Sequence, residues 1–143
     1  MNIHQIYTYN DLRNFTYLLE IGNGEAIVLD PWDSDEINTA LSERSLSLKA
    51  IINTHEHWDH TRGNEALVAA HECEVWAHQN GEGKIPGMTR ALSAGEVVPL
   101  EADVTLTVLD TPGHTFAHLC FLVAGRGVPL AVFTGDTLFN AGV

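Results

Sequence analysis

The segment at residues 54–60, Thr-His-Glu-His-Trp-Asp-His, constrains the fold of this chain more than any other part of the sequence. An apolar run at residues 50–52 precedes it and predicts a buried strand, and the run at 63–71 after it predicts a helix. Three histidines and one aspartate therefore stand at the C-terminal end of a strand. This combination is typical of a metal site, and a histidine-rich polar surface loop is the simpler alternative.

The spacing of these side chains indicates how they can share metal ions. Alternate residues of an extended backbone point to the same side, so His55 and His57 can bind one cation, whereas residues two apart on a helix diverge. A turn beginning near Trp58 would direct Asp59 and His60 to a neighbouring position, where a second ion can bind. Imidazole and carboxylate ligands suit zinc, iron or manganese and do not suit calcium or magnesium.

Two further metal-competent side chains follow predicted strands later in the chain. His114 stands in Thr-Pro-Gly-His-Thr at residues 111–115, and Asp136 stands in Phe-Thr-Gly-Asp-Thr at residues 133–137. Each alone has an ordinary explanation, as a turn histidine or as a cap or turn aspartate. Functional groups on α/β scaffolds are displayed on loops where strands end, so their joint occurrence with the histidine-rich segment favours one metal site.

The composition limits the class of protein. The chain of 143 residues carries a formal net charge of −12 with only seven Lys and Arg residues, which disfavours nucleic-acid binding. Its length fits one domain over residues 1–143, with 45% hydrophobic residues as in globular proteins. No apolar run approaches membrane-spanning length and no signal peptide is evident, which predicts a cytoplasmic protein without membrane contact. Cys73 and Cys120 lack a CxxC pattern and are expected to be buried thiols.

The hydrophobic pattern predicts many strands and two helices. Strands are expected at residues 2–9, 15–21, 25–29, 48–53, 73–77, 97–100, 104–109, 119–124 and 130–134. Helices are expected after a cap at Asp33 or Ser34 through about residue 44, and at 64–72. Residues 79–95 show no clear period and are expected to form a loop. Strands mixed with helices and hairpins indicate an α/β sandwich with mixed strand pairing.

These motifs resemble those of the metallo-β-lactamase-fold hydrolases. The signature is His-x-His-x-Asp-His at residues 55–60, Pro-Gly-His-Thr at 112–115 and Gly-Asp-Thr at 135–137. Within that superfamily, the longer run Thr-Gly-Asp-Thr-Leu-Phe-x-Ala-Gly at 134–142 is similar to that of hydroxyacylglutathione hydrolase, or glyoxalase II. The resemblance covers essentially the whole chain and implies an αββα sandwich.

The resemblance implies a role for each metal-competent side chain. One ion would be held by His55, His57 and His114, and the second by Asp59 and His60, with Asp136 bridging the pair. The family uses two zinc ions, and iron or manganese suits the same ligands. His118 would orient a ligand from behind. The alternative is that His118 is an inward polar residue at a strand start.

The resemblance also implies the chemistry. A hydroxide fixed by the catalytic residues Asp59 and Asp136 would attack the carbonyl of a glutathione thioester, with S-lactoylglutathione giving glutathione and lactate. Outside the signature, Glu56 alternates away from the ligand face and is expected to be structural, and Trp58 to pack as a wall. Residues without a motif are assigned to the surface, namely His4, His71 and His78.

Members of this family continue beyond the point that corresponds to Gly142. The continuation holds a further histidine of the second metal site, the residues that bind glutathione and a helical C-terminal domain. We therefore expect residues 1–143 to form the catalytic domain with an incomplete second half and an activity impaired by truncation. An exposed sheet edge and an uncovered apolar face are also expected, and these favour self-association.

Two other functions remain open at this point. One is a mononuclear iron enzyme like the persulfide dioxygenases of the same fold, with His55, His114 and Asp136 as its ligands. The other is a non-catalytic metal-binding fragment. A nuclease of this fold is disfavoured by the net charge of −12.

Overall fold

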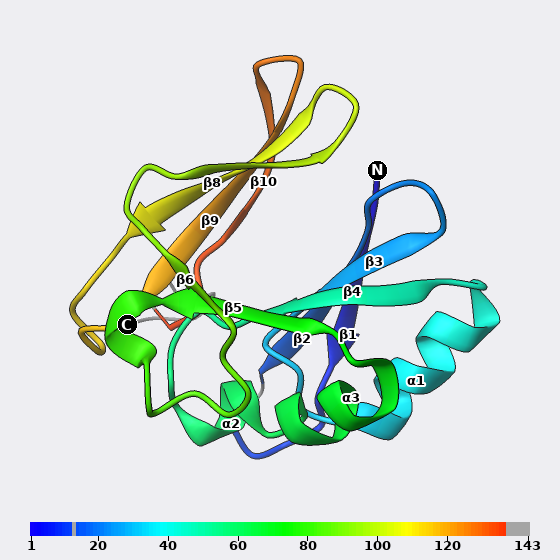
Figure 1. The fold of residues 1–143 in the computed structure, drawn as a ribbon, viewed down its shortest axis with the longest axis horizontal. Coiled ribbons are helices and arrows are strands. Elements are labelled where there is room, and N and C mark those ends of the chain that lie inside the picture. The colour runs from blue at the N-terminus through cyan, green and yellow to red at the C-terminus, as the bar shows by residue number, and fades with distance from the viewer. Residues whose placement is uncertain (13, 137–143) are drawn as a thin grey trace.

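Two packed β-sheets with helices on one outer face make up the computed structural model, which describes residues 1–12 and 14–136 (Figure 1). The first sheet has the strand order β1 (Asn2–Tyr7), β2 (Phe15–Glu20), β3 (Glu25–Leu29), β4 (Ser47–Ile52), β5 (Glu74–His78) and β6 (Arg90–Leu92). The second has the order β10 (Val128–Phe133), β9 (Leu119–Gly125), β8 (Val104–Asp110) and β7 (Val97–Glu101). The helices are α1 (Ser34–Glu43), α2 (Trp58–Thr61) and α3 (Asn64–His71), with a 3-10 turn at Gln79–Gly81.

Strand pairing in the first sheet is mixed, as the sequence predicted. β1, β2 and β3 pair antiparallel, whereas β3, β4, β5 and β6 pair parallel. Parallel neighbours need crossover connections, and α1 lies between β3 and β4 while α2 and α3 lie between β4 and β5. The second sheet is antiparallel throughout its described strands.

Two apolar layers hold these elements together. One lies between the sheets and includes Leu29, Ile52 and Phe121, and the other lies between the first sheet and the helices. Because both faces of the first sheet are covered, the neighbouring residues Ile51 and Ile52 of β4 are both fully buried. The described residues thus form helix, sheet and sheet layers, as expected for the predicted α/β sandwich with an incomplete second half.

Helix α1 begins where the sequence placed its cap. The Asp33 carboxylate accepts hydrogen bonds from the backbone N–H groups of Asp35 and Glu36, at 2.9 and 3.3 Å. These bonds satisfy two donors that have no partner inside the helix. Ile37 and Leu41, four residues apart, bury the inner face of the helix.

The prediction that residues 79–95 form a loop was wrong for residues 90–92. Arg90–Leu92 forms the short strand β6, which pairs parallel with β5. Three residues carry too little periodicity to predict a strand. Strand β6 is instead stabilised by its neighbour β5, where the Arg90 guanidinium lies 4.6 Å from the Trp76 ring centroid. The first strand also ends earlier than expected, at Tyr7, because Tyr9 adopts a left-handed φ of 56°.

The surface assignment of His78 was also wrong. This side chain is buried, and its Nε2 lies 3.2 Å from Asp110 Oδ1. His78 ends β5 and Asp110 ends β8, so the contact connects the two sheets. No short motif predicts such a pair, because its members are separated by 32 residues.

Cys73 and Cys120 are free and buried, as predicted, and burial raises the pKa of the Cys73 thiol. Among the helices of the described residues, none is long and apolar enough to cross a membrane.

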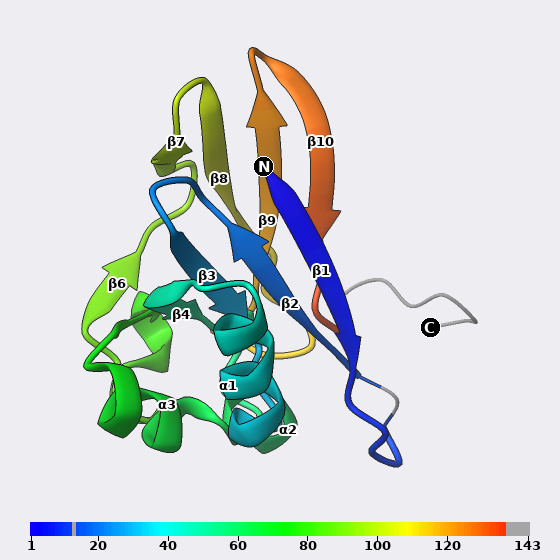
Figure 2. The same cartoon turned by 90° about the vertical axis from the view of Figure 1, so that its right-hand side faces the viewer.

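Strand β10 forms one edge of the second sheet (Figure 2). On the outer face of that sheet it exposes apolar side chains. Val128, Leu130 and Val132 are 59%, 54% and 55% exposed, and no helix of the described chain covers them. Pro129 and a shift of register between Pro129 and Ala131 interrupt the hydrogen-bonding edge itself. Contact through this strand is therefore expected to use its apolar side chains.

We expect the protein to self-associate through this face. Substituting Val128 and Val132 together by Thr keeps β-branched side chains while removing apolar surface, so the apparent mass in sedimentation velocity should fall toward that of a monomer. Val97→Thr is the matched control, since Val97 is 56% exposed on the opposite edge strand β7. A wild-type chain that is monomeric at every concentration would contradict this expectation.

Candidate metal centre

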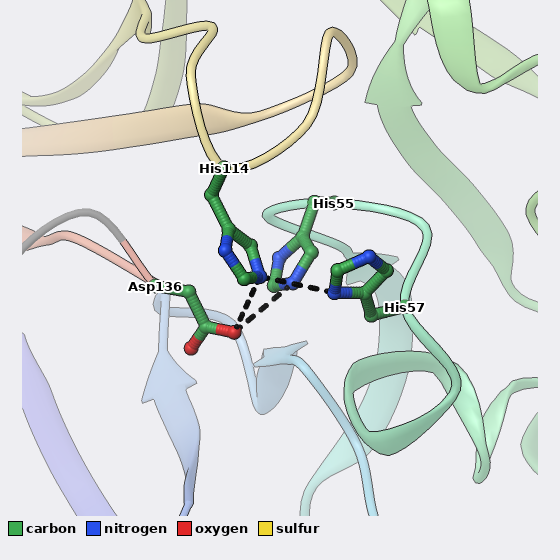
Figure 3. Close-up of side chains that lie close together, drawn as sticks. All are labelled: His55, His57, His114 and Asp136. Atoms are coloured by element: carbon green, nitrogen blue, oxygen red, sulfur yellow. Dashed lines mark hydrogen bonds and ion pairs between the residues drawn. The ribbon is translucent and has the colours of Figure 1, made fainter.

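The histidine-rich segment leaves the C-terminal end of β4 and meets two loops that are distant in sequence. One is the loop between β8 and β9, which carries His114, and the other follows β10 and carries Asp136. Figure 3 shows His55, His57 and His114 directed toward one another and toward the Asp136 carboxylate. Asp59 and His60 lie on α2, a short helix where the sequence predicted only a turn.

The first group of metal-competent side chains is His55, His57, His114 and Asp136, with one candidate ligand atom from each within 4.8 Å of all the others. His114 Nε2 lies 3.0 Å from both His57 Nδ1 and Asp136 Oδ2. His55 Nε2 lies 3.3 Å from Asp136 Oδ2. His55 is fully buried, whereas His57 and His114 are exposed, so the group faces solvent on one side.

The second group is Asp59, His60 and Asp136, and it shares the Asp136 carboxylate with the first. His60 Nε2 lies 3.1 Å from Asp59 Oδ2 and 3.3 Å from Asp136 Oδ1. The two oxygens of Asp136 therefore face different groups. Asn14, which the sequence analysis did not select, also reaches this group, and its Nδ2 donates to Asp59 Oδ2.

The charges of this region favour an added cation. Burial alone would lower the pKa of His60, but the charge of Asp30 and contacts with Asp136 outweigh burial and raise this pKa to about 10. Burial likewise opposes the charged form of Asp136, but contacts with His55 and His60 hold the pKa of its carboxyl well below the ordinary range. Burial, followed by the nearby His55, lowers the pKa values of His57 and His118, the latter to about 4. Neutral imidazoles beside an anionic carboxylate are the form that metal ions bind.

The donor atoms fit a transition metal. Within the described chain, His55 Nε2 is a fully buried side-chain nitrogen that has no hydrogen-bond partner. His114 Nε2 and His57 Nδ1 face each other at 3.0 Å. If both nitrogens carried lone pairs, the two lone pairs would repel each other. A cation bound by these nitrogens and Asp136 would satisfy all of them, and the imidazole and carboxylate set suits zinc, iron or manganese.

Asp30, at the end of β3, orients both groups, and the sequence analysis did not identify it. Its Oδ1 accepts from the Thr54 N–H at 2.8 Å, and its Oδ2 accepts from the Thr54 hydroxyl at 2.7 Å and from His60 Nδ1 at 2.8 Å. His55 Nδ1 in turn donates to the Thr54 hydroxyl oxygen at 2.9 Å. Both imidazoles are thereby fixed with Nδ1 bonded on one side and Nε2 turned toward the Asp136 carboxylate. The signal in the sequence was the Leu-Asp-Pro stretch at residues 29–31, where a carboxylate directly follows a strand.

His118 lies behind Asp136. Its Nδ1 donates to the Thr111 hydroxyl oxygen at 2.9 Å, and its Nε2 accepts from the Asp136 backbone N–H at 3.0 Å. The close approach of His118 to the Asp136 backbone explains why a glycine stands before Asp136. Gly135 has a φ of +51°, and a Cβ atom there would meet His118 Nε2 and Thr54 Oγ1 at 2.8 Å each.

Two neighbours of the ligands have defined contacts. Glu56, assigned a structural role, accepts a 3.0 Å hydrogen bond from the Thr115 hydroxyl and so connects the histidine-rich segment to the His114 loop. Trp58 packs edge-on against Trp32 with ring centroids 4.9 Å apart, yet it is 64% exposed. Thr137 and the Leu138 to Gly142 run, which completed the signature, lie outside the described residues.

Sequence comparison finds relatives along nearly the whole chain. The profile of the Metallo-beta-lactamase superfamily matches residues 9–143. A hydroxyacylglutathione hydrolase from Nitrosococcus oceani is 44% identical over 143 residues, which cover 99% of this chain and 54% of that protein. A relative from Arabidopsis thaliana, named hydroxyacylglutathione hydrolase cytoplasmic, is 35% identical over 90% of this chain and 50% of its own length. The chain thus spans about half the length of the curated relatives it matches.

Solved structures of the same architecture include two that bear on the site. TTHA1623 in a di-iron-bound form superposes with a TM-score of 0.74 and 29% identity, over 98% of this chain and 75% of that one. ETHE1 from Myxococcus xanthus superposes with a TM-score of 0.75 and 25% identity, over 86% of this chain and 54% of that one.

Asp30→Ala should destabilise the protein by about 3 kcal/mol, because it leaves a buried imidazole and two buried Thr54 donors without their acceptor. Urea unfolding in the presence of a chelator measures this loss. Asp35→Ala, at an exposed position of the first turn of α1, is the control and should change stability by less than about 0.5 kcal/mol. Equal effects of the two substitutions would contradict the role of Asp30.

Gly135→Ala should reduce both stability and metal affinity, because the new Cβ displaces either His118 or the Asp136 backbone. Gly127→Ala is a matched control, since Gly127 also has a positive φ, +76°, but its added Cβ would meet nothing within 4 Å. We expect Gly135→Ala to cost about 1–3 kcal/mol more than the control in thermal or urea unfolding. If the two variants behave alike, the close approach at Gly135 is not a constraint.

Proposed function

Since the chain belongs to the metallo-beta-lactamase superfamily, we propose that it is the catalytic part of a binuclear thioester hydrolase of the hydroxyacylglutathione hydrolase type. Its substrate would be an S-2-hydroxyacylglutathione such as S-lactoylglutathione, and its products glutathione and a hydroxy acid. The single observation that carries this proposal is the pair of ligand groups joined by Asp136. The names of the Nitrosococcus and Arabidopsis relatives support the reaction, and the name of the latter supports a cytoplasmic location.

The residues of both groups are suited to bind divalent ions. His55, His57 and His114 would hold one ion, Asp59 and His60 the other, and Asp136 both. Bound zinc, iron or manganese supplies Lewis acidity, which lowers the pKa of water and polarises a carbonyl oxygen. The likeness to TTHA1623 in its di-iron-bound form supports two ions in this arrangement.

The chain's own groups then direct the reaction. Asp59 and Asp136 would orient the attacking water and take up its proton, since both carboxylates belong to the second ligand group and Asp136 also belongs to the first. The leaving group is a thiolate, which departs without strong general-acid help because its conjugate thiol has a pKa of about 8.5. No cationic side chain is therefore required beside the sulfur.

A cavity of about 510 Å3 beside the second ligand group would admit the substrate. Its lining includes His60, Asp136 and Asn14 at the metal side, with Tyr17 and Phe133 at the apolar side. Glutathione is an anion and the chain has a formal charge of −12, so its binding requires local contacts that overcome a repulsive field.

A second candidate is a mononuclear iron dioxygenase. His55, His114 and Asp136 lie together and match the two-histidine, one-carboxylate set of such enzymes. The second group, Asp59 and His60 against Asp136, favours the hydrolase because a mononuclear enzyme has no use for it. Oxygen consumption with a persulfide substrate, against thioester hydrolysis, separates the two.

We expect the purified protein to bind a transition metal and to hydrolyse S-lactoylglutathione. His114→Ala should lower turnover at least tenfold and reduce the metal content by about one ion per chain, because His114 is a ligand of the first ion only. His71→Ala is the control, because His71 lies on α3 and pairs with Asn38. Metal analysis and absorbance of the thioester measure the two quantities. A wild-type chain that binds metal without any thioester turnover would identify a non-catalytic metal-binding fragment.

A further inference from the structure

Asn14, in the loop between β1 and β2, contacts the second ligand group without belonging to it. Its Nδ2 donates a 2.5 Å hydrogen bond to Asp59 Oδ2 and lies 3.4 Å from His60 Nε2. The side chains of Asp59 and His60 are separated from Asn14 by 45 and 46 residues of sequence. The amide therefore contacts two of the three side chains that would bind the second ion.

The partners of Asn14 determine which end of its amide faces them. His60 donates its Nδ1 proton to Asp30, so in the neutral form that binds metal its Nε2 presents a lone pair. The Asp59 carboxylate also only accepts hydrogen bonds. An amide oxygen placed 2.5 Å from a carboxylate oxygen would be repelled, so the NH2 group faces the site.

The backbone around Asn14 holds the side chain in this position. The N–H and the hydroxyl of Thr8 both donate to the Asn14 carbonyl, at 3.1 and 3.0 Å. The Asn14 N–H donates to Asn10 Oδ1 at 3.4 Å. These bonds connect the Asn14 backbone to Thr8 and Asn10.

We propose that Asn14 is a positioning residue for the second ion, and that its amide holds the Asp59 carboxylate in the orientation that binds metal. This inference rests on the two-ion site of the proposed function. A carboxylate oxygen has two lone pairs, so Asp59 Oδ2 can accept the Asn14 N–H and still bind a cation. His60 Nε2 has one lone pair, so its longer contact with Asn14 gives way when an ion binds.

The effect of Asn14 is specific to one of the two ions. The side-chain amide of Asn14 contacts Asp59 and His60 of the second group, and Asp59 receives a charge-assisted hydrogen bond from it. Hydrogen-bond partners of metal ligands typically contribute 10- to 100-fold to metal affinity. Loss of the amide should therefore weaken the second ion by about that factor and leave the first unchanged.

Asn14→Leu tests this, because leucine has a similar shape and no donor. Titration of the metal-free protein with Co2+, followed by visible absorbance and by metal counts after gel filtration, measures each affinity separately. We expect the wild type to bind two ions and Asn14→Leu to bind the second about 10- to 100-fold more weakly, with the first unchanged. Asn38→Leu on α1 is the matched control and should bind both ions as the wild type does, since the Asn38 side chain forms its hydrogen bond with His71, away from both ligand groups.

Three outcomes would overturn the proposal. Asn14→Leu could bind both ions as tightly as the wild type, it could weaken both ions equally as a general structural defect would, or the wild type could bind only one ion. Thermal unfolding with a chelator accompanies the titration, because a purely structural role lowers the melting temperature without changing the ratio of the two affinities. This test reads metal binding and does not depend on thioester turnover. A chain that binds two ions but hydrolyses no thioester would therefore refute the proposed function and leave this inference standing.

Discussion

The buried carboxylate of Asp30 is the interaction on which the candidate metal centre depends. It accepts from the Thr54 backbone and hydroxyl and from His60, and through Thr54 it also sets the orientation of His55. Asp30 itself stands at a left-handed φ of 50°, where aspartate is tolerated better than most residues. One side chain at the end of β3 thus fixes the protonation pattern of two imidazoles that follow the neighbouring strand.

The parallel pairing of β3 and β4 makes this arrangement possible. Parallel strands end at the same edge of a sheet, so Asp30 after β3 and Thr54 after β4 come together without any long connection. The second sheet then brings His114 and Asp136 over this edge from the loops after β8 and β10. Packing between the sheets, through residues such as Ile52 and Phe121, sets the distance between these loops.

The electrostatics of the site follow from burial of opposite charges in a small volume. Asp30, Asp59 and Asp136 surround His60, and Asp136 also contacts His55 and His114. Carboxylates in such a cluster are stable only with positive charge between them, whether it is carried by protons on imidazole or by metal. The raised pKa of His60, about 10, and the lone pair of His55 that lacks a partner both express this need.

The sequence by itself determined the strand that delivers the histidines, the alternation that directs His55 and His57 to one side, and the layered α/β fold. These features depend on local spacing, which a period of two or of 3.6 residues records directly. The sequence motifs also selected His114 and Asp136 as candidate ligands, and only the tertiary structure decided which further side chains orient the ligands. Asp30 and Asn14 act on His60 and Asp59 across 30 and 45 residues, and β6 and the buried His78 likewise depend on neighbours far along the chain. The physical reason is that a hydrogen bond between distant segments follows from how the sheets pack, and it leaves no periodic mark in the chain.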